Sequence, residues 1–225
     1  MGNPVFDYYQ QLSAAYDQDR FGNSYGRYLH RQEHRFLRRA LAPYPPAQVL
    51  DLACGTGRLL EFADTGLDAS PNMLEQARLK WPDKTLVAGD AQALPFAAGS
   101  FAAAFSFHLI MHLSVPQTAQ VLHELHRVLR PGGLLLCDVP SGARRRLSGG
   151  HHRQGWHGSN AFTLPAFLEL AGPQWRLVQY RGALFFPVHR LPESWRQPLG
   201  SLDDWFCRSW AKSFASYLLL GLQKI

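Results

Sequence analysis

Short apolar runs alternate with amphipathic segments along most of the chain. Helical spacing of the apolar positions predicts one or two helices within residues 4–41 and further helices at about 57–63, 71–80, 116–129 and 164–171. The apolar runs predict strands at 48–53, 65–68, 85–88, 101–107, 134–139, 175–183 and 214–223. This alternation of strands and helices predicts a layered α/β fold with a mostly parallel sheet.

Start and stop signals support these boundaries. Ser70 and Pro71 form a cap followed by a proline at the first helical position, so a helix should begin there. The sequence Arg-Pro-Gly-Gly at 130–133 ends the helix before it and leads into the apolar run LLLCDV. A polar, glycine-rich segment of about twenty residues follows Val139, which is long for a simple connection.

The composition fits one globular unit. The chain has 225 residues, enough for a single α/β domain, and no internal boundary is evident. Its three cysteines lack close spacing, which argues against a disulfide framework and predicts a reducing, cytoplasmic setting. No apolar run is long enough to span a bilayer, and the first residues, MGNPVFDYYQQL, lack a signal-peptide pattern.

The net charge of +6 is concentrated locally. Residues 20–39 hold six arginines against one glutamate, and Arg144, Arg145 and Arg146 form a second cluster. The clusters fit either a solvated helix face and loop or a surface for phosphate or nucleic acid. The pattern favours the first interpretation, because no aromatic-basic interleaving of a nucleic-acid module accompanies it.

The stretch DLACGTG, residues 51–57, places two glycines where a buried strand ends. Glycines at that point let the backbone turn tightly and admit a ligand where a Cβ atom would collide. A dinucleotide-binding turn would need a third glycine at position 60, where this chain has Leu60.

Acidic residues mark the ends of successive predicted strands. Asp51 lies in the first strand, Asp68 ends the second, and Asp90 follows the third. The carboxyl ends of parallel strands meet at one edge of the sheet, so these side chains should converge beside the glycine turn. A carboxylate there can bind the hydroxyls of a ribose, and another can accept a hydrogen bond from an adenine amine.

The motifs DLACGTGRLLEF, GLDASPNMLEQAR, AGDAQALPF, SFAAAFSFHLIMHL and HRVLRPGGLLL occur in this order. Together they resemble class I S-adenosylmethionine-dependent methyltransferases, most of all the small-molecule branch of ubiquinone/menaquinone and sugar N-methyltransferases. The resemblance implies a Rossmann-like, seven-stranded, mostly parallel sheet with helices on both faces and an antiparallel last strand. The resemblance also implies a single domain, residues 1–225, with three parts: an N-terminal helical lid (1–41), a cofactor-binding core (48–139) and a substrate-side region (140–225).

The resemblance also implies S-adenosylmethionine as cofactor. Asp51 would order the loop and the cofactor's amino group, Asp68 would bind the ribose, and Asp90 the adenine amine. Phe107 would lie under the methionine chain, and Tyr16 would close over the cofactor, although the N-terminal aromatic residues fit plain core packing equally. The implied cofactor-binding set is Tyr16, Asp51, Ala53, Gly55, Thr56, Gly57, Asp68, Ala69, Met73, Asp90, Ala91, Gln92 and Phe107.

Histidines supply the candidates for a general base, if the acceptor needs one. His108 follows the fourth strand and is placed to face a substrate, whereas His112 fits a helix residue that contacts backbone or cofactor. His151, His152 and His157 lie in the long polar segment. No carboxylate or cysteine accompanies these three at ligand spacing, so no metal site is predicted.

The acceptor is argued by exclusion. The run SFHLIM is unlike the Asn-Pro-Pro-Tyr type of motif that accompanies methylation of nucleic-acid amines, so nucleic acid is not favoured as a partner. Tryptophans and phenylalanines enrich the last third of the chain, which favours a small, partly apolar acceptor methylated at oxygen, nitrogen or carbon. The chain is expected to be a monomer or a homodimer.

Three other functions stay open at this point. An RNA or tRNA methyltransferase would use the basic face of residues 20–39. A non-catalytic cofactor-binding partner subunit would fit the absence of an evident base and the presence of Ala102, where the resembling family often has aspartate. A dinucleotide oxidoreductase is disfavoured by Leu60 and Asp90.

Overall fold

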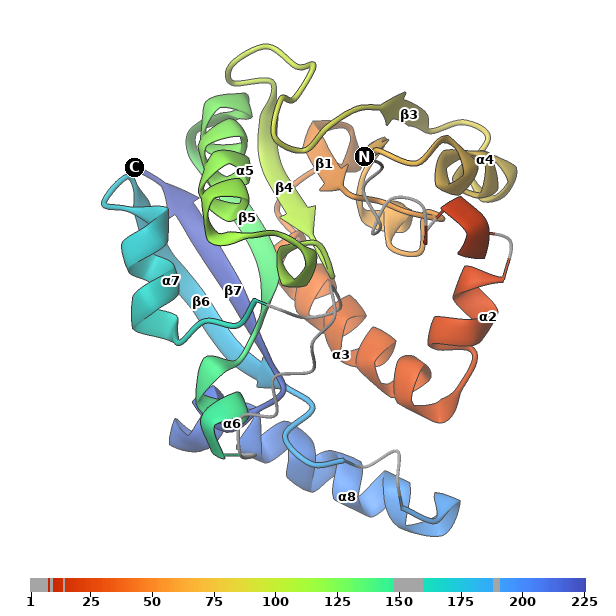
Figure 1. Ribbon diagram of the computed structural model, residues 1–225, viewed down its shortest axis with the longest axis vertical. Coiled ribbons are helices and arrows are strands. Elements are labelled where there is room, and N and C mark those ends of the chain that lie inside the picture. Colours follow the sequence, from red (N-terminus) through yellow and green to blue (C-terminus); the bar gives the residue numbers. More distant parts are fainter. Residues whose placement is uncertain (1–7, 9, 14, 148–159, 188–190) are drawn as a thin grey trace.

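A computed structural model describes residues 8, 10–13, 15–147, 160–187 and 191–225. They form a seven-stranded sheet with the order β3-β2-β1-β4-β5-β7-β6 (Figure 1). Strands β1 to β5 pair in parallel, and β7 runs antiparallel to both β5 and β6. The strands are β1 (Val49–Leu52), β2 (Thr65–Asp68), β3 (Thr85–Ala88), β4 (Phe101–Ser106), β5 (Leu129–Pro140), β6 (Trp175–Ala183) and β7 (Tyr217–Lys224).

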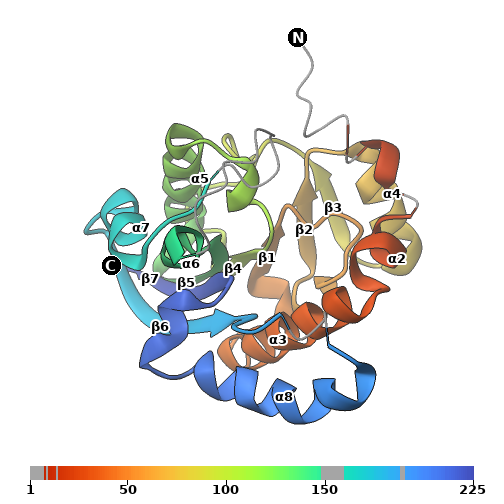
Figure 2. The same ribbon diagram turned by 60° about the horizontal axis from the view of Figure 1, so that its bottom comes forward.

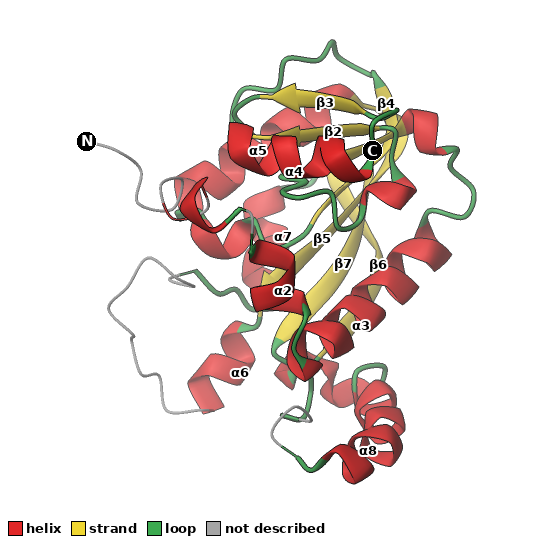
Figure 3. Ribbon diagram, turned by 90° about the vertical axis from the view of Figure 1, so that its right-hand side faces the viewer, coloured by secondary structure: helices red, strands yellow, loops and turns green. Residues whose placement is uncertain are grey.

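Helices cover both faces of the sheet (Figure 3). On one face α5 and α7 bury Leu122 and Phe167 with Leu50 of β1. On the other face α3 buries Leu37 against Phe105 of β4. The helices are α2 (Tyr16–Phe21), α3 (Ser24–Ala40), α4 (Pro71–Lys80), α5 (Val115–Val128), α6 (Gly142–Leu147), α7 (Leu164–Ala171) and α8 (Glu193–Phe206), with 3-10 turns at Pro46–Gln48, Leu60–Phe62, Ile110–His112 and Trp210–Phe214.

The strand order creates a switch point at β1. The chain moves outward from β1 to β2 and β3, and then returns to place β4 on the other side of β1. Every residue of β1 is buried, as expected for a parallel strand covered on both faces. Loops that leave the carboxyl ends of β1 and β4 therefore diverge and open a crevice between them.

The predicted helix at 57–63 is wrong. The segment forms turns and a single 3-10 turn at Leu60–Phe62, because Gly57 adopts φ of 75° and β2 already begins at Thr65. Strand β5 also begins earlier than predicted, at Leu129, and the predicted start of the last strand falls in the 3-10 turn at Trp210–Phe214. Helix α8 was not predicted.

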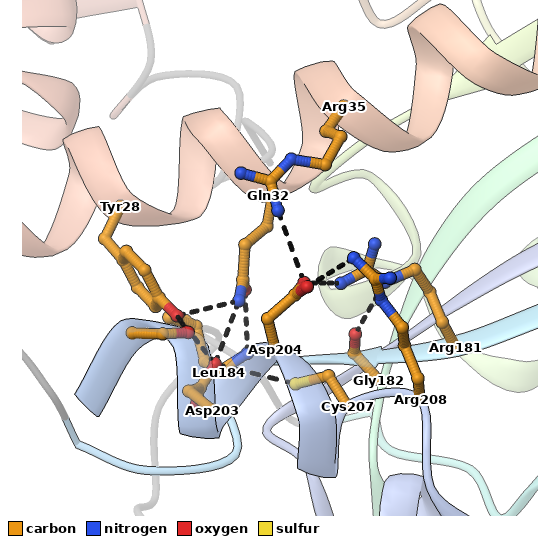
Figure 4. Close-up of polar contacts among 11 residues, drawn as sticks. Tyr28, Gln32, Arg35, Arg181, Gly182, Leu184, Asp203, Asp204, Cys207 and Arg208 are labelled. Atoms are coloured by element: carbon orange, nitrogen blue, oxygen red, sulfur yellow. Dashed lines mark hydrogen bonds and ion pairs between the residues drawn. The ribbon is translucent and has the colours of Figure 1, made fainter. Parts of the chain in front are cut away.

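Helix α8 lies beside α3 at one end of the molecule (Figure 2). Asp203 of α8 is fully buried and joins the two helices: its Oδ2 accepts hydrogen bonds from Tyr28 Oη and Gln32 Nε2, both at 2.9 Å (Figure 4). Its Oδ1 accepts a hydrogen bond from the Phe186 backbone N–H at 2.6 Å. Gln32 Oε1 in turn accepts from the Leu184 N–H at 3.0 Å. One carboxylate therefore holds α8, α3 and the end of β6 together.

Replacing Asp203 with alanine should destabilise the protein by about 2–3 kcal/mol, because the buried donors of Tyr28, Gln32 and Phe186 lose their shared acceptor. Urea unfolding measures this change in the free energy of unfolding. Asp83→Ala removes an exposed acid and serves as the matched control. An equal, small effect of both substitutions would contradict the anchoring role of Asp203.

Candidate functional site

A cavity of about 220 Å³ opens at the carboxyl ends of β1, β2, β3 and β4. Its walls come from the loops that follow these strands and from helix α2. Most of the residues that the sequence singles out line it. They are Tyr16, Ala53, Gly55, Asp68, Ala69, Met73, Asp90, Ala91, Gln92, Phe107, His108 and His112.

A second cavity of about 40 Å³ adjoins the first. The two share the walls formed by Tyr16, Ala53, Gly55, Phe107 and His108. Asp51 and Thr56 line the second cavity, whereas Gly57 lines neither and faces a groove on the other side of the turn. The predicted set thus surrounds a larger chamber and a smaller one, with Gly57 outside both.

Three residues of the turn after β1 have positive φ angles. Ala53, Gly55 and Gly57 have φ of 59°, 55° and 75°, a region that favours glycine. A Cβ atom at Gly55 would have no protein atom within 4 Å, so this backbone faces open space. A Cβ atom at Gly57 would lie 2.9 Å from Trp81 Cδ1, so Gly57 is required for packing of the turn against α4.

Asp68 connects the end of β2 to the glycine turn. Its Oδ2 accepts a hydrogen bond from the Gly55 N–H at 2.8 Å, and its Oδ1 accepts one from the Ser70 N–H at 2.8 Å. Burial raises the pKa of the Asp68 carboxyl, and these N–H donors oppose the rise. The same carboxylate lines the larger cavity, so it both shapes the turn and faces the site.

Asp51 is a buried carboxylate at the smaller cavity. Burial raises its pKa well above the ordinary value; nearby Arg58 opposes this rise and Asp68 adds to it. Among the described residues, no hydrogen bond to the Asp51 carboxylate is found. A cationic group placed in the smaller cavity would therefore find a desolvated negative partner.

The far wall of the larger cavity follows β3. Asp90 Oδ1 accepts a hydrogen bond from the Gln92 N–H at 2.8 Å, which fixes the loop that carries Ala91. Met73, at the start of α4, is 2% exposed and lines the same cavity. An acid and a thioether thus both line the cavity, a combination that suits a flat heterocycle with an amine.

Helix α2 is tied to the glycine turn. Thr56 Oγ1 donates a hydrogen bond to Asp17 Oδ1 at 2.6 Å, and Lys80 of α4 forms an ion pair with Asp17. Lys80 Nζ also donates to the Thr56 carbonyl at 2.9 Å. These contacts place Tyr16, the neighbour of Asp17, in the walls of both cavities.

A buried charge network lies beneath the shared wall. His108 Nε2 is 2.7 Å from Glu33 Oε1, and His108 Nδ1 is 3.4 Å from Asp138 Oδ2. Arg58 Nη2 is 2.8 Å from Glu33 Oε2. The Arg58 guanidinium lies 3.9 Å from the centre of the Phe21 ring, which links the network to α2.

The network favours a protonated His108. Burial lowers the pKa of its imidazole, but Glu33 and Asp138 outweigh burial and raise it. Burial raises the pKa of the Glu33 carboxyl, whereas Arg58 and His108 outweigh that effect and hold it at about 2. Both imidazole nitrogens face a carboxylate, and the role of His108 as a general base stays a prediction.

The other predicted histidines differ in position. His112 lines the larger cavity, whereas His151, His152 and His157 lie outside the described residues. Among the described residues, no group of three or more histidine, cysteine or acidic side chains is placed to hold a metal ion. Within the same residues, no helix is long and apolar enough to cross a membrane.

Sequence reasoning did not find the partners of His108. Residues 20–39 contain six arginines and a single acid, Glu33. A lone acid in a basic helix is a signal of a buried ion pair. Asp138 interrupts the otherwise apolar run of residues 134–139, a second such signal. Arg58, directly after the glycine turn, carries no signal that separates it from a solvated residue.

Part of the chain is similar to known methyltransferases. Residues 50–137 match the family model described as a methyltransferase domain. An uncharacterised methyltransferase of Synechocystis sp. is 35% identical over 113 residues, covering 47% of this chain and 53% of that protein. A demethylmenaquinone methyltransferase of Renibacterium salmoninarum is 41% identical over 113 residues, covering 47% and 46%. The chain thus spans about half the length of the curated relatives it matches.

Solved structures share the fold over the whole chain. Magnesium protoporphyrin IX methyltransferase from Synechocystis, solved with bound S-adenosylhomocysteine, aligns with a TM-score of 0.68 at 13% identity and covers 98% of both chains. The expected seven-stranded Rossmann-like architecture, with β7 antiparallel, is confirmed.

The pH dependence of stability should reveal the protonated state of His108. Its folded pKa lies above the unfolded value of about 6.5, so its stabilising contribution is complete below pH 6.5 and is lost as pH rises through the folded pKa. His108→Asn, which tolerates the residue's φ of 63°, should cost about 2 kcal/mol at low pH and less at high pH.

Urea unfolding of wild type and variant between pH 6 and pH 9 measures this difference. His123→Asn alters an exposed histidine of α5 and should leave the profile unchanged. A His108→Asn cost that does not vary with pH would contradict the protonated assignment.

The unpartnered carboxylate of Asp51 should make the protein less stable without ligand. Its folded pKa is raised, so the cost of holding the ionised form is complete above that pKa, shrinks as pH falls through it and is gone below the unfolded pKa of about 3.9. Asp51→Asn should therefore raise the free energy of unfolding at pH 7.5 by about 1 kcal/mol, with a smaller gain in acid. Urea unfolding without ligand tests this, with Asp83→Asn as the exposed control; a destabilised Asp51→Asn protein would contradict it.

Proposed function

We propose that this chain is a class I S-adenosylmethionine-dependent methyltransferase that transfers a methyl group to a small organic acceptor. The methyltransferase domain matched by residues 50–137 and the shared fold support this proposal. The observation that carries the proposal is the convergence of Asp51, Asp68 and Asp90 around the open backbone of Gly55. That arrangement matches the three polar parts of an adenosyl amino acid: an ammonium, a ribose and an adenine amine.

Each part of the cavity is proposed to bind one part of the cofactor. Asp68 accepts hydrogen bonds from the ribose hydroxyls, since its carboxylate retains acceptor capacity beside the Gly55 and Ser70 donors. Asp90 and the backbone of Ala91 bind the adenine edge, with Met73 against the ring. In the smaller cavity Asp51 pairs with the ammonium group, which supplies the hydrogen-bond donor that no described residue gives its buried carboxylate.

When bound, S-adenosylmethionine supplies an activated methyl group on a sulfonium, and the acceptor's nucleophilic atom displaces the thioether in line. The residues of this chain bind, orient and exclude water. Tyr16 and Phe107, in the wall that both cavities share, are proposed to flank the reacting groups. Tyr16 reaches that wall because Thr56 and Lys80 hold its neighbour Asp17 on the turn.

The proposed acceptor gives up its proton without help from His108. That histidine is proposed to position the loop after β4. Its backbone N–H donates a hydrogen bond to Asp138 Oδ1 at 2.7 Å, and its imidazole ring lies between the carboxylates of Glu33 and Asp138. His112, which lines the larger cavity, is the remaining described histidine proposed to face the site. An oxygen, nitrogen or carbon nucleophile that is already reactive at neutral pH therefore fits best.

The acceptor is proposed to be a small, partly apolar metabolite. Support comes from one relative and one structural neighbour. Their names contain demethylmenaquinone and magnesium protoporphyrin IX, and both of these compounds are partly apolar and contain rings. The apolar lining that Phe107, Leu109 and Leu113 give the larger cavity is in keeping with such acceptors.

Calorimetric titration with S-adenosylhomocysteine tests the proposed cofactor site. The wild-type protein should bind S-adenosylhomocysteine and not NAD. Asp68→Ala should weaken binding by about 1–3 kcal/mol, because charge-assisted hydrogen bonds to the ribose are lost. Asp64→Ala, at the opposite end of β2, is the matched control and should bind as wild type does.

Binding of NAD without S-adenosylhomocysteine would contradict the assignment. Methyl transfer is then tested with a donor carrying a labelled methyl group and a panel of phenolic, quinol-type and amine metabolites. Label should enter one acceptor class with the wild-type protein and much less with Asp68→Ala. Tight S-adenosylhomocysteine binding with no labelled product from any class would favour a non-catalytic cofactor-binding subunit.

A further inference from the structure

A groove of about 680 Å³ borders the glycine turn. Its walls come from α2, one side of α3, the turn itself and the end of α4, and α2 lies between the other two helices (Figure 2). Of the predicted cofactor-binding residues, Gly57 alone lines it. Apart from Arg58, which also lines the smaller cavity, the groove is separate from the proposed cofactor site, and methyl transfer leaves it without a ligand.

The walls of the groove are joined to one another by polar contacts. Asp17 of α2 forms an ion pair with Lys80 of α4, and Lys80 Nζ donates a hydrogen bond to the Thr56 carbonyl of the turn at 2.9 Å. Trp81 Nε1, directly after α4, donates to the Gly57 carbonyl at 2.8 Å. These contacts hold three of the four walls in place without a ligand.

The basic side chains of the groove outnumber its acids. Arg27, Arg31, Arg58 and Lys80 line it, and the acid in the lining is Asp17. Lys80 compensates Asp17, and Arg58 pairs with the buried glutamate of α3 described above. Among the described residues, neither Arg27 nor Arg31 forms an ion pair with an acid. Their two positive charges therefore have no counterpart, which favours an anion in the groove.

The position of Arg27 and Arg31 separates them from ordinary solvated arginines. They are four residues apart on α3, so they share one side of the helix, and both line the groove. Arg27 Nη1 donates to the Gly22 carbonyl, and its guanidinium keeps further N–H donors. Arg38 and Arg39, near the end of the same helix, are also exposed but do not line the groove.

His30 adds a neutral hydrogen-bond donor to the same wall. Arg58 Nη1 is 2.8 Å from His30 Nδ1, and because a guanidinium can only donate, Nδ1 is the acceptor. Burial and then the Arg58 charge lower the pKa of the His30 imidazole, which favours its neutral form. In that form the proton is on Nε2, so this residue also presents an N–H at the groove.

We propose that this groove binds a small organic phosphate, with the phosphate groups on Arg27 and Arg31. The planar fork of a guanidinium matches the oxygens of a phosphate, and two such forks on one side of a helix suit a diphosphate. Phe21 and Trp81 line the groove as well and offer apolar ring surface to the organic part. The volume lies within the range of small-molecule sites, roughly 300–1,000 Å³.

The groove suits a small molecule more than a nucleic acid. A single strand would follow the basic face along α3, including Arg38 and Arg39, and would stack successive bases on aromatic side chains. Here the two aromatic rings stand inside the groove with Arg27 and Arg31. The proposal goes beyond the proposed methyl transfer and does not depend on it.

Calorimetric titration of the full chain tests the proposal with two probes, uridine diphosphate and inorganic pyrophosphate. Saturating S-adenosylhomocysteine is present in both titrations, so that the cofactor cavities do not receive the nucleotide. Both probes should bind, and uridine diphosphate should bind several-fold more tightly because its organic part contacts the aromatic walls. Added salt should weaken the binding of both.

The double variant Arg27→Ala, Arg31→Ala should bind uridine diphosphate at least about tenfold more weakly than wild type, because the charge-assisted hydrogen bonds to the phosphates are lost. The matched control is Arg38→Ala, Arg39→Ala, which removes the same charge from the same helix outside the groove and should bind as wild type does. Thermal unfolding and S-adenosylhomocysteine affinity should be unchanged in both variants, which shows that they are folded.

Absence of binding by both probes would overturn the proposal, as would equal losses of affinity in the two double variants. Equal affinity of the wild-type protein for the two probes would overturn the assignment of an organic phosphate. Tighter binding of a single-stranded RNA than of uridine diphosphate, weakened by Arg38→Ala, Arg39→Ala, would also overturn it and assign α3 to nucleic acid. The comparison of the two variants stands even if S-adenosylhomocysteine does not bind, so failure of the proposed function is distinguishable.

Discussion

The site depends on the hydrogen bond from the Gly55 N–H to the carboxylate of Asp68. This contact joins the end of β1 to the end of β2 at 2.8 Å and holds the turn in its left-handed winding. With the turn fixed, the side of Gly55 that lacks a Cβ atom faces open space. A local constraint between neighbouring parallel strands thus creates the surface on which a ligand can approach the main chain.

The second requirement is compensation of buried charge. Glu33, Arg58, His108 and Asp138 come from α3, the glycine turn, the loop after β4 and strand β5, and they meet beneath the shared wall of the cavities. Desolvation of such groups is costly unless each is paired. Asp51 is the exception, because it is buried beside this network without a hydrogen-bonding partner among the described residues. We propose that this carboxylate is kept for a cationic ligand, at a cost to the stability of the free protein.

Many of the element boundaries and the positions of the acids at the strand ends could be predicted from neighbouring residues in the sequence. The bounds of β2, β3, β6, α4 and α7 follow from cap residues, turns and apolar runs, and the structure has them where the sequence places them. The acids at the strand ends were predictable for the same reason, since their positions are set by the strands that precede them. The site roles assigned to Asp51, Asp68 and Asp90 stay predictions, because no bound ligand tests them.

What could not be predicted depends on contacts distant in sequence. Glu33 of α3 meets His108 of the loop after β4, and α8 is positioned by hydrogen bonds that Asp203 accepts from residues about 170 positions earlier. The segment 57–63 has helix-forming residues, yet Gly57 and the early start of β2 leave room only for turns. In the first two cases the deciding contacts are distant in sequence, and in the third the turn overrode the helical preference of the segment.

The most direct test of the account is a crystal structure of the protein with S-adenosylhomocysteine. We expect the ribose hydroxyls on Asp68, the adenine between Met73 and Asp90, and the ammonium group within hydrogen-bonding distance of Asp51. Density for the nucleoside outside these cavities, or an ammonium group directed away from Asp51, would contradict the account.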